Sequence, residues 1–335
     1  MKAAVFHGPM DVRFEEIAKP TLAEGEVLIR VRACGICGSD LHTYRHGMFL
    51  QLGAPIESGR VLGHEFSGEI AEICGDVEGV QVGDRVVTVG MGGNAEYIKI
   101  SKAMTNFLIP LSDSVSFEEG ATAEPLATSL HGVNLANPQD NETHVIMGAG
   151  IIGLGILQGI KHFSSAKTIV VDLSDKRLAM AAELGADITI NAAKQDVVAT
   201  IMQTTGSHQL GVVEAVDGNV DTVFDCAGMG KNFKGTSVLQ QAISLVKQNG
   251  QVIIVAIFEK NPDIDYNVVV RKGIQIKGSW AWTPEEFTQA SELISSGKID
   301  RKPLISHTFQ LEDASKAYET QLLAEEAVKV MFTPS

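Results

Sequence analysis

Three side chains in the first part of the chain have the chemistry to hold a metal ion: Cys37, His64 and Glu65. Thiolate and imidazole groups are preferred zinc ligands in proteins, and a carboxylate is a common third ligand. Further along, residues 148–153 read Gly-Ala-Gly-Ile-Ile-Gly, a pattern that lets backbone amides approach the phosphates of a dinucleotide. A metal that polarises an alcohol oxygen needs a hydride acceptor, and a nicotinamide supplies one. The two motifs together predict metal-dependent oxidation of an alcohol.

The glycine pattern is a weak signal alone, and its surroundings strengthen it. A short apolar strand is expected at 144–147, a helix at 151–163, and a second strand at 167–172 that ends on Asp172. An acidic residue at this spacing is expected to accept hydrogen bonds from the adenosine ribose. The alternative is a tight strand–helix turn in a domain of the same fold that binds no nucleotide.

Each position of the glycine pattern has an expected role. Gly148 allows the tight turn, Gly150 lets the backbone approach the pyrophosphate, and Gly153 permits close packing of helix on strand. Ile151 and Ile152 open the helix, whose N-terminal N–H groups and positive dipole end are expected to face the phosphates.

A second cysteine stands close to the candidate metal ligands. Cys34 and Cys37 form a C-x2-C pair, but no second pair completes a structural zinc finger. A redox dithiol is one alternative for this pair, and we favour a small buried Cys34. For Cys37 and His64 the alternative is a buried structural cysteine and a core histidine.

Composition excludes several classes of protein. The formal charge of −14 argues against nucleic acid or an anionic membrane as partner. Four cysteines at irregular spacing do not form a disulfide pattern, and the N-terminus shows no signal peptide. The longest apolar run, 145–157, is too short to span a bilayer. We therefore expect a cytoplasmic protein.

The texture of the sequence predicts two domains. Runs such as 27–31 and 68–73 favour antiparallel strands closing on a small barrel-like core. From about residue 142, strands and helices alternate, which predicts a parallel sheet covered on both faces. We expect a discontinuous architecture, with residues 1–125 and 283–335 forming one domain and residues 126–282 the inserted nucleotide domain.

Further elements are expected in the second and third parts of the chain. The strands are at 187–190, 222–225 and 251–255, and the helices at 176–184, 237–246, 284–296 and 311–323. Asn249-Gly250 is interpreted as the stop of the helix 237–246.

Several segments together resemble the medium-chain, zinc-dependent alcohol dehydrogenases, in particular the polyol and 2,3-butanediol dehydrogenase branch. They are 61–69, 83–86, 95–97, 124–127 and 224–228, and the resemblance extends over nearly the whole chain. It implies a GroES-like, mostly antiparallel catalytic domain and a Rossmann doubly wound domain.

The resemblance also implies a ligand set. Cys37 and His64 would bind zinc, and Glu65 ligates directly in many polyol-type relatives. Glu124 stands where other members of the family place a second cysteine ligand, so it could bind zinc or hold the zinc-bound water.

The segment between the first two ligands matches the family's proton relay. Ser39 would accept the alcohol proton and pass it through the nicotinamide ribose to His42 and solvent. Asp40 would orient His64. The alternatives are a solvated helix-face histidine at His42 and a plain N-cap at Asp40, for a helix beginning near Leu41.

On the cofactor side, Arg177 matches a family position that contacts the adenosine ribose or phosphate, and its alternative is an exposed helix charge. Ile257 is also assigned to the cofactor site. Because Asp172 would repel a 2′-phosphate and can accept a bond from a free 2′-hydroxyl, the expected cofactor is NAD.

Two departures from the family pattern change the expectations. The lobe that binds a structural zinc in relatives is missing, because residues 88–94 lead directly into 95–97. We therefore expect one zinc per chain and a tight turn made possible by Gly90, Gly92 and Gly93. At 279–282, Ser-Trp-Ala-Trp replaces a more polar segment, which predicts a bulkier pocket wall.

The expected function is reversible, NAD-dependent oxidation of a secondary alcohol, a small vicinal diol or polyol such as 2,3-butanediol or sorbitol, to a ketone. A homodimer or homotetramer is expected. The alternatives are oxidation of L-threonine or an aminoalcohol, metal-free reduction of quinones or enones with NADPH, and a non-catalytic nucleotide-binding protein.

Overall fold

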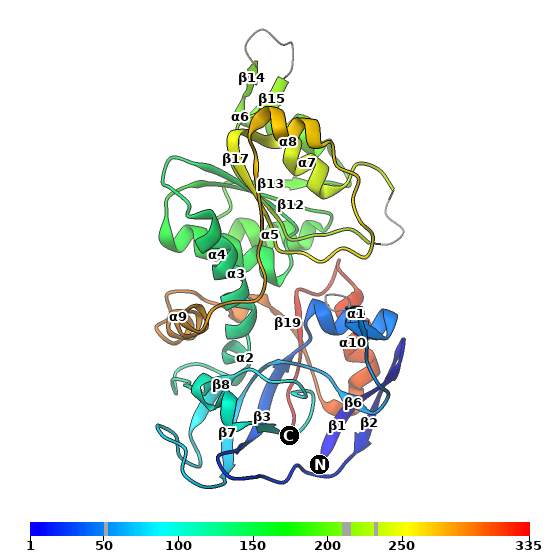
Figure 1. Ribbon diagram of the computed structural model, residues 1–335, viewed down its shortest axis with the longest axis vertical. Coiled ribbons are helices and arrows are strands. Elements are labelled where there is room, and N and C mark those ends of the chain that lie inside the picture. The colour runs from blue at the N-terminus through cyan, green and yellow to red at the C-terminus, as the bar shows by residue number, and fades with distance from the viewer. Residues whose placement is uncertain (50–52, 210–215, 231–233) are drawn as a thin grey trace. The chain divides into compact units, whose positions relative to one another are not determined.

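The computed structural model describes residues 1–49, 53–209, 216–230 and 234–335. It divides into two compact units, which Figure 1 shows with their labelled elements. The first unit comprises Met1–Ala127 and Thr283–Ser335, and the second comprises Thr128–Trp282.

The first unit is built on a seven-stranded sheet that joins both ends of the chain. Its strands are β3 (Val27–Gly35), β7 (Glu65–Ile73), β8 (Arg85–Thr88), β9 (Tyr97–Ile100), β10 (Ile109–Pro110), β19 (Ile305–Phe309) and β20 (Lys329–Phe332). β3 pairs antiparallel with β7, β9 and β20, whereas β19 and β20 are parallel. The last strands of the chain therefore complete the sheet that the first third begins.

Apolar side chains explain why these segments form a sheet. Val27, Ile29 and Val31 alternate along β3, and they form a buried cluster with Phe66 and Ile70 of β7. Alternation of this kind places one face of each strand in the core.

Smaller elements complete the first unit. A three-stranded sheet contains β1 (Lys2–Gly8), β2 (Asp11–Glu16) and β6 (Arg60–Val61), and β4 (Met48–Phe49) pairs with β5 (Ala54–Pro55). The helices are α1 (Gly38–His46), α2 (Phe117–Gly120), α9 (Pro284–Ser295) and α10 (Ala314–Leu322), while α3 (Ala123–Ala136) begins here and continues into the second unit.

The second unit is a doubly wound parallel sheet. Its strand order is β13-β12-β11-β16-β17-β18, with β13 (Ile188–Asn191), β12 (Lys167–Asp172), β11 (Thr143–Met147), β16 (Val220–Asp225), β17 (Val246–Ile254) and β18 (Gln275–Gly278). The order reverses between β11 and β16, which is the topological switch point of a Rossmann sheet. The fold class expected from the sequence is confirmed.

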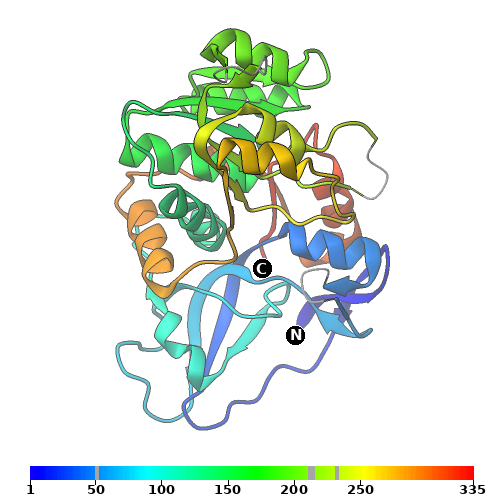
Figure 2. The ribbon, with the colours of Figure 1, turned by 45° about the horizontal axis from the view of Figure 1, so that its top comes forward.

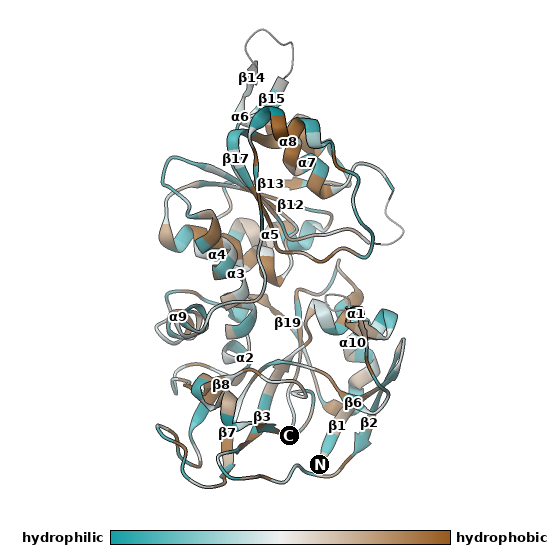
Figure 3. Ribbon diagram, viewed as in Figure 1, coloured by the Kyte–Doolittle hydropathy of each residue, from teal (hydrophilic) through white to brown (hydrophobic). Residues whose placement is uncertain are grey.

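Helices cover both faces of this sheet (Figure 2). They are α4 (Ile151–Phe163), α5 (Asp175–Glu183), α6 (Val197–Thr205), α7 (Val238–Leu245) and α8 (Tyr266–Lys272). Hydrophobic residues mark α7 and α8 in Figure 3, and Leu239, Ile243 and Val269 pack into the sheet core. The strands β14 (Ser207–Gln209) and β15 (Val216–Gly218) form a separate two-stranded antiparallel sheet.

One expected helix boundary is wrong. α7 ends at Leu245 and β17 begins at Val246, so Asn249-Gly250 lies inside a strand and does not stop the helix. Asn249 has a φ of 60°, and a Cβ on Gly250 would lie 2.8 Å from the carbonyl oxygen of Asp221. The pair therefore forms a bend where β17 crowds its neighbour.

In the described part of the chain, no helix combines the length and the hydrophobicity needed to cross a membrane.

Candidate active site

Strand pairing brings the candidate metal ligands together. Cys37 caps the N-terminus of α1, just after β3, and Glu65 is the first residue of β7. In the antiparallel ladder between these strands, Gly35 pairs with Glu65. The end of β3 and the start of β7 therefore lie side by side, and His64 directly precedes this start of β7.

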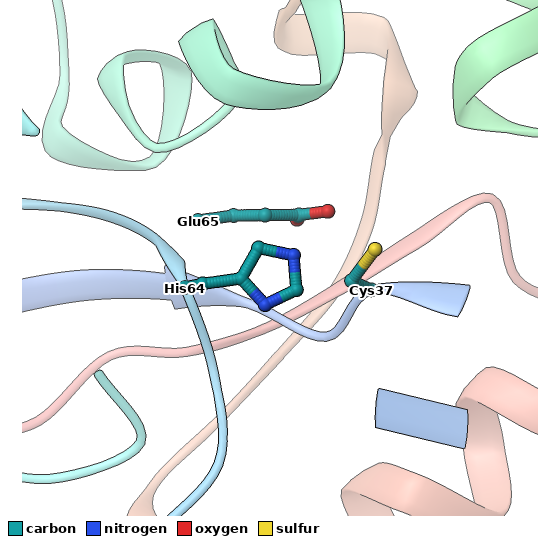
Figure 4. A group of neighbouring side chains, drawn as sticks. All are labelled: Cys37, His64 and Glu65. Atoms are coloured by element: carbon teal, nitrogen blue, oxygen red, sulfur yellow. The ribbon is translucent and has the colours of Figure 1, made fainter. Parts of the chain in front are cut away.

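The three donor groups converge on one space. One ligand atom each from Cys37, His64 and Glu65 lies within 4.8 Å of the others. Figure 4 shows the thiol, the imidazole and the carboxylate turned toward one another. Glu65 is 1% exposed, and its Oε1 atom has no hydrogen-bond partner among the described residues. A buried carboxylate oxygen without a partner is unfavourable unless a cation binds it, so the donor set fits a zinc ion.

The other oxygen of Glu65 is held by a lysine. Lys329 Nζ lies 2.5 Å from Glu65 Oε2 and also donates to the carbonyl oxygen of Ile36 at 3.0 Å. Burial lowers the pKa of Lys329, but the nearby charges of Glu65 and Cys37 outweigh it and raise that pKa above its usual value. Gly35 leaves room for this ion pair, since a Cβ there would lie 2.3 Å from Glu65 Oε2. Sequence reasoning missed Lys329.

Neighbouring groups stabilise the charged form of His64. Burial lowers the pKa of His64, but the thiolate of Cys37 and the carboxylates of Asp40 and Glu124 raise it well above the usual value for histidine. The Nδ1 atom lies 3.9 Å from Asp40 Oδ1, which is an ion-pair distance and too long for a hydrogen bond.

Asp40 connects the helix to the ligand strand. Its Oδ2 accepts from the N–H of Cys37 at 3.0 Å, and its Oδ1 accepts from the N–H of Gly63 at 3.3 Å. Asp40 is the third residue of α1, so it closes the first turn of the helix and is not the N-cap. Burial raises the pKa of Asp40, although His64 and these N–H groups act in the opposite direction.

The two expected relay residues occupy one helix. Ser39 and His42 both belong to α1, and the spacing of three residues places them on the same helix face. Ser39 is buried, and its Oγ has no hydrogen-bond partner among the residues described. His42 is half-buried.

The structure places Glu124 and Cys34 differently from the three donors. Glu124 lies in the first turn of α3; its charge reaches His64, but it is not part of the compact donor group. Cys34 is fully buried, and burial raises the pKa of its thiol well above the usual range. A thiol in that state is a poor redox nucleophile, which favours the small buried residue over the dithiol.

The glycine loop of the second unit joins β11 to α4. Gly148 has a φ of 104°, which side chains rarely allow, and a Cβ on Gly153 would lie 1.8 Å from the carbonyl oxygen of Gly148. Both glycines are therefore needed by the protein itself. At Gly150 a Cβ would meet nothing within 4 Å, so its backbone stands open to a ligand at the N-terminus of α4, which Ile151 and Ile152 begin. This cradle fits a dinucleotide phosphate.

Asp172 is anchored beside the glycine loop. Its Oδ2 accepts from the N–H of Ala149 at 2.6 Å, and its Oδ1 from the N–H of Ser174 at 2.9 Å. Arg177 Nη1 lies 4.0 Å from Asp172 Oδ2. Ile257 is partly buried, and its carbonyl oxygen lies against Gly228.

Segment 88–94 forms a turn, but the turn does not require a glycine at every position where the sequence has one. Gly92 has a φ of 115°, and a Cβ on Gly93 would lie 2.8 Å from Cys34 Sγ. At Gly90 the nearest atom would be 3.4 Å away, an ordinary contact, so the expected need for glycine there is wrong. In the other departing segment, Trp280 is 57% exposed and Ala281 has a φ of 54°.

Known proteins share both units. Residues 23–125 match the family described as the alcohol dehydrogenase GroES-like domain, and residues 152–296 match the family described as zinc-binding dehydrogenase. The chain is 32% identical to the (R,R)-butanediol dehydrogenase of Bacillus subtilis over 367 aligned positions, which cover 100% of both proteins. It is also 32% identical to a sorbitol dehydrogenase of the same species, covering 100% of this chain and 98% of that one.

The fold agrees with a solved structure. The crystal structure of 2R,3R-butanediol dehydrogenase from Bacillus subtilis matches with a TM-score of 0.83 at 30% identity, covering 100% of this chain and 99% of that chain.

The two family matches and the shared fold define the class of protein as a dehydrogenase. The chain belongs to the medium-chain, zinc-dependent alcohol dehydrogenase family, in its polyol and butanediol dehydrogenase branch. It is an oxidoreductase, and the family uses an NAD(P) cofactor.

Proposed function

We propose that the protein oxidises a small vicinal diol or polyol at a secondary alcohol, reversibly, with NAD as hydride acceptor. The first unit would be the catalytic domain and the second the NAD-binding domain. The observation that carries the proposal is the convergence of Cys37, His64 and Glu65, with one buried carboxylate oxygen left unpaired among the described residues.

Glu65 is the third zinc ligand in this proposal. Its ligand atom belongs to the compact donor group, whereas Glu124 does not. Because Oε2 is bonded to Lys329, Oε1 is the oxygen without a protein partner among the described residues, and it would be the one available to hold zinc. Glu124 contributes its charge to His64 from the first turn of α3.

The residues around the metal would handle the alcohol proton. Zinc, when bound, supplies a Lewis acid that polarises the alcohol oxygen and eases loss of its proton. Ser39 would accept that proton at its Oγ while its own hydroxyl proton leaves, and His42, on the same face of α1, would take up the released proton and give it to solvent. Asp40 fixes the backbone of Cys37 and Gly63 by accepting a hydrogen bond from the N–H of each.

The cofactor is NAD in this proposal. Gly148 and Gly153 would shape the loop so that the backbone of Gly150 can approach the pyrophosphate, and Asp172 is held by two N–H groups at the end of β12. An anchored carboxylate there repels a 2′-phosphate and accepts from a free 2′-hydroxyl. Arg177 and Ile257 would line the same site.

The substrate class follows from relatives. Two relatives of this chain are named for (R,R)-butanediol and for sorbitol, a diol and a polyol. Oxidation of an aminoalcohol such as L-threonine is the alternative within this family.

The zinc count and the assembly are also proposed. We propose one zinc per chain and no structural zinc, because the segment between β8 and β9 is a short turn. The alignment with the butanediol dehydrogenase spans 367 positions against 335 residues here, so part of it has no counterpart in this chain. We also propose a homodimer or homotetramer. A reducing cytoplasm is proposed as its compartment, because the four cysteines are free.

A substrate panel tests the proposal. Purified protein is assayed by NADH absorbance with the isomers of 2,3-butanediol, sorbitol, L-threonine and ethanol, each with NAD and with NADP. We expect the highest kcat/KM for a diol or polyol with NAD. A preference for L-threonine, or for NADP, would contradict the substrate class or the role of Asp172 respectively.

A further inference from the structure

Gly63, the residue directly before His64, is enclosed by three other segments. Its N–H donates to Asp40 Oδ1 at 3.3 Å, and its carbonyl oxygen accepts from the N–H groups of Gly92 and Gly93, both at 2.9 Å. Its φ of 88° lies in the left-handed region that favours glycine. The peptide groups on both sides of Gly63 are therefore held by hydrogen bonds, and His64 follows the second of them.

Asn94 closes the remaining side of this enclosure. A Cβ on Gly63 would lie 2.3 Å from Asn94 Oδ1 and 2.9 Å from Cys34 Sγ, so both atoms pack against the Cα of Gly63. The N–H of Asn94 donates to the carbonyl oxygen of Leu62 at 3.0 Å, and its Nδ2 donates to Tyr318 Oη at 2.9 Å. Asn94 is fully buried.

The amide of Asn94 is only half satisfied. Among the described residues, its Oδ1 has no hydrogen-bond partner. A buried amide oxygen without a partner costs stability, and an apolar side chain of similar size would avoid that cost. Because Oδ1 packs against Gly63, we look for the role of this polar side chain in the position of the Gly63 backbone and not in core stability.

We propose that Asn94 is a positioning residue for the metal centre. The side-chain amide of Asn94 is bonded to Tyr318 at one end and packs on Gly63 at the other. It thereby fixes the position of the backbone just before His64, and with it the orientation of the imidazole. The segment that is shortened relative to the family thereby takes part in shaping the site. The inference rests on the proposed function, because it requires zinc at Cys37, His64 and Glu65.

The full-length Asn94→Ala variant tests the proposal through metal binding. Zinc affinity is measured by competition with a chelator, and the visible spectrum is recorded after cobalt substitution. We expect zinc affinity to fall about 10-fold, the size seen when a ligand's support is removed, and the cobalt bands to shift. A variant that loses only thermal stability, with unchanged affinity and spectrum, would show a merely structural role and overturn the proposal.

Two further variants keep the test decisive. Asn191, in the second unit, is also a buried asparagine, with Nδ2 bonded to Leu173 and Asp175. Asn191→Ala should lower the melting temperature without changing zinc affinity. Tyr318→Phe removes only the hydroxyl and should weaken zinc binding by a smaller factor. If Asn94→Ala does not fold, wild-type affinity and cobalt spectrum in Tyr318→Phe overturn the proposal.

The wild-type protein separates this inference from the proposed function. Failure of the wild type to bind zinc through Cys37 would contradict the proposed function. Normal zinc binding in the wild type, with equal affinity in Asn94→Ala, contradicts only the role of Asn94.

Discussion

Only one of the two carboxylate oxygens of Glu65, at the proposed metal centre, has a hydrogen-bond partner among the described residues. Lys329 binds Glu65 Oε2, whereas Oε1 stands unpaired among the residues described. Both side chains are 1% exposed, so neither charge can be screened by water. The lysine supplies the opposite charge that a buried carboxylate needs when no metal is bound.

Replacing Lys329 by Met should therefore destabilise the zinc-free protein. Breaking a buried ion pair at one end leaves the other charge uncompensated, at a cost of about 3–5 kcal/mol in unfolding free energy. Zinc should restore part of this loss, because it can compensate Glu65. Denaturant unfolding with and without zinc measures both effects.

The matched control is the double variant Glu65→Gln, Lys329→Met, which has no unpaired charge and should be more stable than Lys329→Met. Equal stability of Lys329→Met and the wild type without zinc would contradict this account of the pair.

At the scale of elements, two of the glycines at the junction of β11 and α4 have different surroundings. Gly153 packs against the carbonyl oxygen of Gly148, where a Cβ would lie at 1.8 Å. Gly150 meets no protein atom at its Cβ position within 4 Å. The first serves the fold and the second is free to serve a ligand.

Gly153→Ala and Gly150→Ala should consequently behave differently. Gly153→Ala is expected to lower the melting temperature and NADH affinity together, because the helix must shift on the strand. Gly150→Ala should leave the melting temperature nearly unchanged and weaken NADH binding by about 10-fold, through an added methyl beside the phosphates. Thermal unfolding and NADH fluorescence titration report the two quantities. Unaltered NADH affinity in Gly150→Ala would contradict the cradle.

The same junction shows what a sequence can predict. The helix 151–163 and the strand 167–172 were expected with the bounds that the structure has, because glycine punctuation and apolar runs are local signals. The helix stop predicted at Asn249-Gly250 is wrong, because the pair lies inside β17, where Gly250 packs against Asp221 of the neighbouring strand, a contact that no local pattern reveals.

The supports of the site were beyond sequence reasoning. Lys329 and Glu65 are 264 positions apart, and Asn94 and Tyr318 are 224 apart. No local pattern links such pairs, and only the pairing of β20 with β3 brings Lys329 to the ligands. The ligand residue types, by contrast, could be proposed from chemistry and from the family resemblance.

Over the whole molecule, each unit has a hydrophobic core of its own. Val145, Ile169 and Val223 belong to the core of the second unit, and Ile29 and Phe66 to that of the first. A change at Cys37, His64 or Glu65 is therefore expected to leave the core of the second unit intact. Loss of metal and loss of cofactor binding should be separable.

Zinc content per chain, measured by elemental analysis in the wild type and in Cys37→Ser, tests the central claim most directly. The claim is that Cys37, His64 and Glu65 hold the one zinc on which catalysis depends. We predict close to one zinc per wild-type chain, and almost none in a Cys37→Ser protein that still binds NADH but has negligible turnover. Two zinc ions per chain with one surviving Cys37→Ser, or near-normal turnover in the metal-free variant, would contradict it.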